Sequence, residues 1–108
     1  MPELYTADAR LTGIGPDKIG ITAISQWAEQ RAAMKERRSR HVQTNIVLEG
    51  LSPRLIRGTV VLTLFRHDGS GDAPSTPVLV GEYNDAYALC ADGRWRIGER
   101  HLAILFGN

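Results

Sequence analysis

The fold is decided by the stretch from Val78 to Phe106, which reads VLVGEYNDAYALCADGRWRIGERHLAILF. Two strand-like runs in it, both rich in β-branched and aromatic residues, flank the dipeptide Asp92-Gly93. Asp-Gly between two such runs is a strong signal for a tight turn. The stretch is therefore predicted to form a long β-hairpin.

The charges of the two runs favour one register for this hairpin. With the Asp-Gly pair at the centre of the turn, Asp85 faces Arg100 and Tyr83 faces Leu102. A slip of one residue would instead place Asp85 opposite Glu99. Opposite charges across a ladder contribute roughly 0.2 to 1 kcal/mol, whereas like charges destabilise it, so we expect the first register.

This register divides the hairpin into two faces. We expect the first face to be concave and to line a cavity, and it carries Tyr83, Asp85, Tyr87, Leu89, Gly98, Arg100, Leu102, Ile104 and Phe106. The opposite, outer face carries Glu82, Asn84, Glu99 and His101 together with a set of apolar residues, Val80, Ala86, Ala88, Trp95, Ile97, Ala103 and Leu105.

The rest of the chain supplies one helix and further strands. Apolar residues at three- and four-residue steps, Trp27 among them, predict an amphipathic helix over residues 20–35. Its last turn is expected to hold the cations Lys35, Arg37, Arg38 and Arg40. A solvated helix end is the expected role of this cluster, and contact with a phosphate is the alternative. Three further strands are predicted, over residues 7–11, 40–49 and 56–67. The second and third of these are expected to form another hairpin, which turns at Pro53. The segment after it, residues 68–77, is expected to be a surface loop.

One helix covers only part of one sheet face, so the sheet must bend around it. The expected fold is α+β, a cone-shaped roll in which a curved, mostly antiparallel sheet wraps around a helix. The 108 residues allow one domain, spanning 1–108. Thirteen Lys and Arg against twelve Asp and Glu give a net charge of +1, which suggests neither a nucleic-acid nor a membrane partner. The lone Cys90 and the lack of a signal peptide make the cytoplasm the expected location.

Four segments taken together resemble a known superfamily: YTADARL, GITAISQWAEQR, SRHVQTNIVLEG and GEYNDAYALCADGRWRIGERH. They are similar to the nuclear transport factor 2-like superfamily, in its SnoaL-like branch. That branch also includes polyketide cyclases, scytalone dehydratase, bile acid 7-alpha-dehydratase and the beta subunits of aromatic-ring dioxygenases. The most specific parts of the resemblance are Arg40-His41 followed by Asn45, and the run Gly81, Tyr83, Asp85, Asp92-Gly93, Trp95-Arg96-Ile97 and Arg100.

The resemblance implies a cavity that binds a small molecule, and also a departure from the pattern of the family. Members usually begin with two further helices, which close the cone and supply a tyrosine and an acid in the dehydratase branch. This chain starts just before the first strand. Either the start is misplaced or the gene is shortened, or another subunit closes the cone.

The resemblance and the pattern together give candidate site residues. The catalytic candidates are His41, Asp85 and Arg100, and the ligand-binding candidates are Asn45, Tyr83, Tyr87, Trp27 and Leu102. His41 and Asn45 lie four apart on one strand and hence on one face, and the near-neutral pKa of histidine suits proton transfer. The alternative is a histidine hydrogen-bonded at a subunit or helix contact. Asp85 with Arg100 is either an acid or base beside an oxyanion-binding cation, or a structural ion pair.

No cofactor or metal site is expected. The three histidines, His41, His67 and His101, show no ligand spacing. Gly13-Ile14-Gly15 lacks the third glycine of a dinucleotide-binding loop, and no nucleophile motif surrounds Cys90.

Two functions remain open at this point. The first is a cofactor-free lyase, such as a dehydratase, or an isomerase that acts on a small apolar or polycyclic compound. The second is a non-catalytic module for binding or dimerisation. The apolar outer face of the long hairpin predicts a homodimer, with Trp95 and Ile97 near the contact and residues 1–5 reaching toward the partner.

Overall fold

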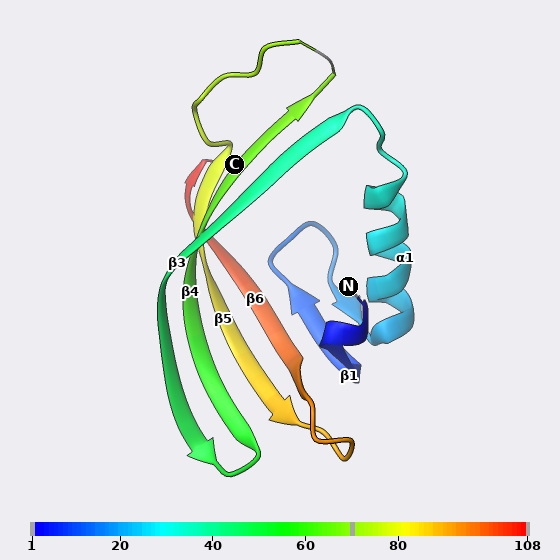
Figure 1. The fold of residues 1–108 in the computed structure, drawn as a ribbon, viewed down its shortest axis with the longest axis vertical. Helices are drawn as coiled ribbons and strands as arrows, with labels where there is room; N and C mark the ends of the chain where they lie inside the picture. The colour runs from blue at the N-terminus through cyan, green and yellow to red at the C-terminus, as the bar shows by residue number, and fades with distance from the viewer. Residues whose placement is uncertain (1, 70, 108) are drawn as a thin grey trace.

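Six strands form one mixed sheet in a computed structural model that describes residues 2–69 and 71–107. The order across the sheet is β2-β1-β6-β5-β4-β3. Only the β1–β6 pair is parallel among the described strands, and the others are antiparallel (Figure 1). In chain order the elements are η1 (Pro2–Leu4), β1 (Tyr5–Thr12), β2 (Lys18–Ile19), α1 (Ile21–Ala32), β3 (Arg37–Ser52), β4 (Leu55–Asp68), β5 (Leu79–Leu89) and β6 (Trp95–Gly107).

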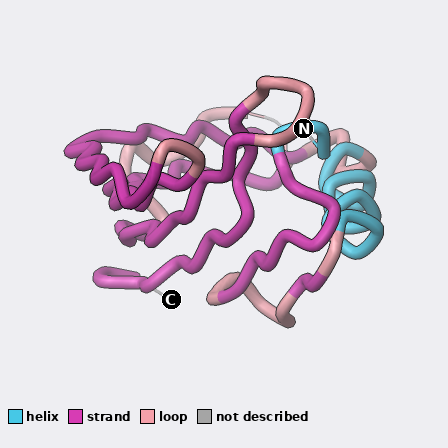
Figure 2. The backbone as a smooth tube through the Cα atoms, turned by 90° about the horizontal axis from the view of Figure 1, so that it is seen from below, coloured by secondary structure: helices cyan, strands magenta, loops and turns pink. Residues whose placement is uncertain are grey.

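The sheet is curved and does not close, which confirms the predicted α+β roll with mostly antiparallel strands. Figure 2 shows the curved set of strands with the helix at one side. α1 packs against β1, β2 and η1, and it buries Ile24. β3, β4 and β5 lie on the other side of the molecule from α1 (Figure 1). Within the described residues, no helix has the length and apolar character that a membrane crossing requires.

The helix is shorter than the sequence predicts. It ends at Ala32, and the cations assigned to its last turn, Arg37 onward, lie in β3 instead. Arg37 pairs with Asp68 across the β3–β4 ladder, and its Nε donates to the carboxylate at 2.6 Å. Ladder hydrogen bonds and this ion pair therefore extend β3 into the segment whose charges would also suit a helix end.

The core of the described residues consists of two clusters of buried side chains. Val60, Leu62, Leu64, Tyr83 and Leu102 form the first cluster, on β4, β5 and β6. The second combines Tyr5, Ala9, Leu11 and Ile24, from β1 and α1. Ile14, from the loop after β1, packs against both clusters and joins them.

The predicted register of the β5–β6 hairpin is confirmed over its middle. Asp85 is paired with Arg100 and Tyr83 with Leu102. The predicted two-residue turn is wrong, because Cys90 is paired with Arg94 through a 2.8 Å hydrogen bond from N–H to carbonyl. The loop therefore has three residues, and its last, Gly93, has a φ of 82°. A left-handed glycine at that place is the usual conformation of three-residue hairpin loops.

A β-bulge at Gly98 compensates for the extra turn residue and corrects part of the predicted faces. Between the turn and the bulge Leu89 is paired with Trp95 and Tyr87 with Ile97, so both β6 residues share the inner face with their partners. Ile97 packs against the cluster around Ile24. A second irregularity near Leu105 pairs Phe106 with Val80, on the outer face. Trp95, Ile97 and Phe106 thus lie on the faces opposite to those predicted.

The loop after β1 runs so close to β6 that it requires a glycine. Gly13 has a φ of 84°, and a Cβ added there would collide with the backbone carbonyl of Leu102. The close approach keeps Ile14 between the two core clusters. Gly69 has a comparable φ of 104°, but a Cβ there would meet open space.

We predict that Gly13→Ala destabilises the protein much more than Gly69→Ala. Gly69→Ala costs only the left-handed backbone conformation, about 1–2 kcal/mol, whereas Gly13→Ala must also move the loop away from β6. Urea unfolding of both variants measures the difference. Equal losses of unfolding free energy would show that the loop can move away from β6 at no cost.

Candidate functional site

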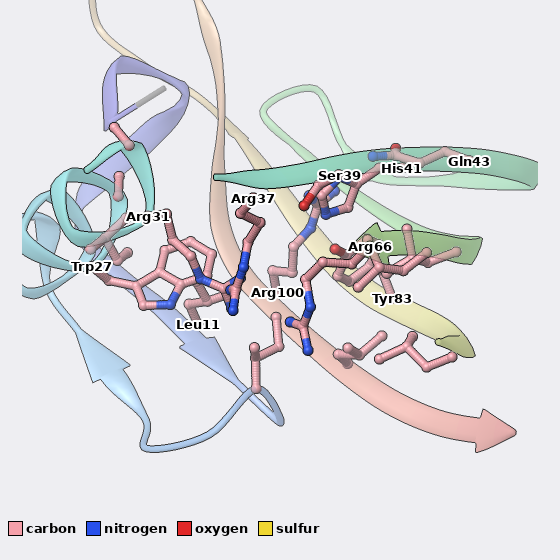
Figure 3. Close-up of a pocket in the computed structure, with 18 of the residues that line it drawn as sticks. Leu11, Trp27, Arg31, Arg37, Ser39, His41, Gln43, Arg66, Tyr83 and Arg100 are labelled. Carbon is pink, nitrogen blue, oxygen red and sulfur yellow. The ribbon is translucent and has the colours of Figure 1, made fainter. Parts of the chain in front are cut away.

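A pocket of about 620 Å³ lies between α1 and the inner face of the sheet. Its volume falls within the range of about 300–1,000 Å³ that small-molecule sites occupy. α1 contributes one wall and β3, β4, β5 and β6 contribute the other (Figure 3). The apolar part of the lining is Leu11, Ile14, Ile24, Trp27, Ala28, Ala32, Met34, Leu62, Leu64, Leu79 and Leu102.

His41 lines this pocket from β3, as the sequence predicts. Its Cα is paired with that of buried Leu64, and Ser39 and Gln43 flank it along the same wall. The residue as a whole is exposed to solvent. Partial burial lowers the pKa of His41, and the positive charges of Arg31 and Arg100 lower it further. His41 is therefore neutral at pH 7 and able to accept a proton.

Asn45 does not reach the pocket, contrary to the sequence prediction. Two β3 residues, Asn45 and Ile46, oppose the single residue Val60 of β4 in a β-bulge. Asn45 adopts a φ of 52°, the left-handed conformation that asparagine tolerates better than most residues. The bulge breaks the alternation of side chains that would have placed Asn45 on the same wall as His41.

Asp85 lies behind the pocket wall, where it anchors Arg100. Its side chain has 0% exposed area, against 14% for Arg100. Arg100 donates from Nε and Nη2 to the two carboxylate oxygens at 2.9 and 2.8 Å, and the Tyr87 hydroxyl donates to one of them at 2.6 Å. Burial and the neighbouring carboxylate raise the pKa of Tyr87 to about 12. Neither Asp85 nor Tyr87 lines the pocket, so their geometry fits the structural alternative.

Arg100 and Tyr83 form the part of the wall in front of this anchor. The Arg100 guanidinium stacks 4.1 Å above the centre of the Tyr83 ring. Burial acts to lower the pKa of Arg100, but the hydrogen bonds and charge of Asp85 outweigh it and raise the pKa. Arg100 is thus a fixed cation at the pocket. Leu102 and Trp27, also predicted from the sequence, line the pocket as well.

Three arginines that the sequence analysis did not single out also line the pocket: Arg31, Arg37 and Arg66 (Figure 3). Arg66 continues the alternation of Leu62 and Leu64 along β4, and that pattern is the signal that would have placed it on the inner face. No group of three or more His, Cys, Asp or Glu side chains in the described part of the chain could hold a metal ion.

The model of the SnoaL-like domain family matches residues 1–101. The chain belongs to the SnoaL-like family. This family, within the nuclear transport factor 2-like proteins, includes cofactor-free dehydratases, isomerases and cyclases. The resemblance found in the sequence is therefore confirmed.

Solved structures share the architecture of this SnoaL-like domain at low sequence identity. A scytalone dehydratase candidate from Novosphingobium aromaticivorans superposes with a TM-score of 0.81 at 20% identity, covering 97% of this chain and 68% of its own. ActVI-ORFA from Streptomyces coelicolor superposes with a TM-score of 0.80 at 18% identity, covering 96% of this chain and 79% of its own. A hexachlorocyclohexane dehydrochlorinase, LinA type 2, superposes with a TM-score of 0.76 at 17% identity, covering 97% of this chain and 70% of its own.

At such identities these structures establish the fold alone. The SnoaL-like domain spans 68% of the first of these chains and 57% of another solved relative, a Mycobacterium tuberculosis protein of unknown function. Among curated proteins, no match to this chain is found.

We predict that Asp85→Asn destabilises the domain by roughly 3 kcal/mol or more, because Arg100 would lose the charge that neutralises it in a largely buried position. Asp92→Asn is the matched control. Asp92 also forms a two-point pair with an arginine, Arg96, but on the surface, so its loss should be much smaller. Chemical denaturation measures both. Equal losses of unfolding free energy in the two variants would show that burial does not make the Asp85–Arg100 pair more important for stability than a surface pair.

Proposed function

We propose that this SnoaL-like domain binds a small, largely apolar and polycyclic compound and catalyses a cofactor-free lyase or isomerase reaction on it. The observation that carries the proposal is His41, a histidine with a lowered pKa in the wall of a mostly apolar pocket. A titratable group with a perturbed pKa in a cleft is the usual mark of a proton-transfer site.

In the proposed reaction His41 acts as the base and Arg100 as the electrostatic partner. Neutral His41 removes a proton from a carbon next to a carbonyl group of the ligand. Negative charge then develops on the carbonyl oxygen, and Arg100, fixed by Asp85 and backed by Tyr83, stabilises it. The His41 imidazolium returns the proton to a departing hydroxyl group, which leaves as water, or to another carbon. The first outcome is a dehydration and the second an isomerisation.

We predict that bicyclic β-hydroxy ketones are dehydrated by the protein and that His41→Ala abolishes this turnover with little change in thermal stability. Because partial burial, and then the charges of Arg31 and Arg100, lower the pKa of His41, the rate should fall only at a pH below the ordinary histidine pKa of about 6.5. The absorbance of the conjugated product follows the reaction. His101→Ala is the control, since His101 pairs with Asn84 on the outer face and should leave the rate unchanged.

Two results would contradict the proposal. One is the absence of turnover across ketones of one to three rings. The other is turnover that survives in His41→Ala, which would remove the proton-transfer role.

A second candidate function, self-association, is supported by the exposed surface of β3. Among the described strands, β3 is the last of the sheet and is paired with β4 alone. Its exposed large apolar residues are Val42, Ile46, Val47, Leu48 and Leu51, each with 44–63% of its surface exposed. Long apolar edge strands readily pair with a second chain. We propose that a homodimer forms through this strand, rather than through Trp95 and Ile97.

We predict that the protein sediments as a dimer at micromolar concentration and that Val47→Lys converts it to the 11.9 kDa monomer. A lysine at the centre of the strand places a charge in the contact, and charged side chains on edge strands oppose pairing. Thr22→Lys on the exposed side of α1 adds the same charge away from β3 and should leave the dimer intact. A single 11.9 kDa species for the unmodified protein would overturn the proposal.

A further inference from the structure

We infer that the ligand of this pocket carries an oxyanion group, a carboxylate or a phosphate, on its apolar skeleton, and that Arg31 and Arg66 bind that group. The inference rests on the proposed function only in using the same pocket, and it adds the charge and polarity of the compound that enters. It is carried by the arrangement of charges around the pocket.

Among the described residues, every ionic side chain that lines the pocket is cationic. They are Arg31, Arg37, Arg66 and Arg100, and His41 is the remaining basic group. No Asp or Glu lines the pocket within residues 2–69 and 71–107. The whole chain, in contrast, is almost neutral, with a net charge of +1. The positive charge is therefore concentrated at the pocket, where walls of low dielectric constant strengthen its attraction for an anion.

Two of the four arginines are neutralised by the protein itself. Arg100 is held by buried Asp85 through two hydrogen bonds. Arg37 is held by Asp68 in the same two-point manner, from Nε at 2.6 Å and from Nη2 at 3.1 Å. These two arginines therefore already have the carboxylate partner that a guanidinium prefers.

Arg31 and Arg66 have no such partner. In the part of the chain that the structure describes, no carboxylate lies within ion-pair distance of either. Arg31 reaches the pocket from α1 and Arg66 from the end of β4, so they approach the same space from its two walls (Figure 3). Burial lowers the pKa of Arg31, and the charges of Arg37 and Arg66 lower it further, because the cations repel one another. The charge of Asp68, which pairs with Arg37, acts in the opposite direction but does not outweigh them.

This repulsion destabilises the folded protein, because like charges gathered in a cleft oppose folding. A favourable interaction must therefore compensate for it. Trp27 compensates for part of it, since the Arg31 guanidinium lies 5.2 Å from the centre of the indole ring. Stacking leaves the N–H groups at the edge of the guanidinium plane available to an acceptor. A ligand oxyanion would relieve the repulsion and accept those hydrogen bonds.

The remaining lining describes the rest of the ligand. Next to the arginines, Ser39, His41 and Gln43 form a polar row on β3. The other lining residues are largely apolar, with Leu62, Leu64 and Leu102 at the base. A site with one cationic end and an apolar base fits an amphipathic acid. It does not fit an extended polyanion, whose many charges would have to enter the apolar part.

The test compares 2-naphthoate with 2-naphthamide, which share the rings and differ in charge, by calorimetric titration of the full chain. A third arm uses 2-naphthyl phosphate, to distinguish the two kinds of oxyanion. We expect the better oxyanion to bind about 10- to 100-fold more tightly than the amide, with an affinity that falls as salt is added. Arg31→Gln and Arg66→Gln should each remove most of that advantage and leave the binding of the amide unchanged. Arg57→Gln, on the same strand as Arg66 but outside the pocket, should change neither.

The outcomes separate this inference from the proposed function. Equal affinities for the amide and both anions would overturn the inference and leave an apolar binding pocket intact. The same holds for an anion preference that survives both pocket variants, because the arginines named here would not be its source. If none of the three compounds binds, both the inference and the proposed ligand class are wrong. Amide binding that persists in Arg31→Gln and Arg66→Gln shows that these variants are folded.

Discussion

The buried carboxylate of Asp85 is the constraint on which the rest of the structure depends. A carboxylate without solvent contact must be hydrogen-bonded and neutralised, and here Arg100 and the Tyr87 hydroxyl do both. The pair fixes which residues of β5 and β6 face each other. It also holds the Arg100 guanidinium over the Tyr83 ring at the wall of the pocket. One interaction thus sets the register of the hairpin and places a cation where a ligand would meet it.

The features of the fold that depend on local pattern and charge were predictable. Opposite charges gave the register around Asp85, and β-branched runs gave the second hairpin. The bulges at Asn45 and Gly98 were not predictable, because they depend on contacts between distant segments. Ile97 turns inward to meet a cluster that includes Ile24 of the helix, and nothing in the hairpin itself specifies that contact.

The candidate site was predicted in part, for related reasons. The family resemblance directed His41 into the cavity, and His41 lies on a regular stretch of strand that lines the pocket. Strand alternation put Asn45 on the same face, but Asn45 lies in the bulge and was misplaced. Arg37 was missed because the charges after the helix suit a helix end as well as a strand. Arg31 and Arg66 indicate an anion site only when they are seen to line the same pocket, and they come from different elements, the helix and β4. Sequence alone does not show that they share a space.

The three-residue turn of the β5–β6 hairpin has a further consequence, which concerns chain length. Fourteen residues, 86–99, separate Asp85 from Arg100. A two-residue turn with no bulge would satisfy that count equally well, but it would direct Ile97 to solvent. The turn and the bulge therefore act together. The extra residue of the loop exchanges the inner and outer faces for the β6 residues next to the turn. The bulge at Gly98 exchanges them back, so that Arg100 still faces Asp85. A related chain can gain or lose a residue in this turn only if the bulge changes with it, so sequence variation at the two places must be linked.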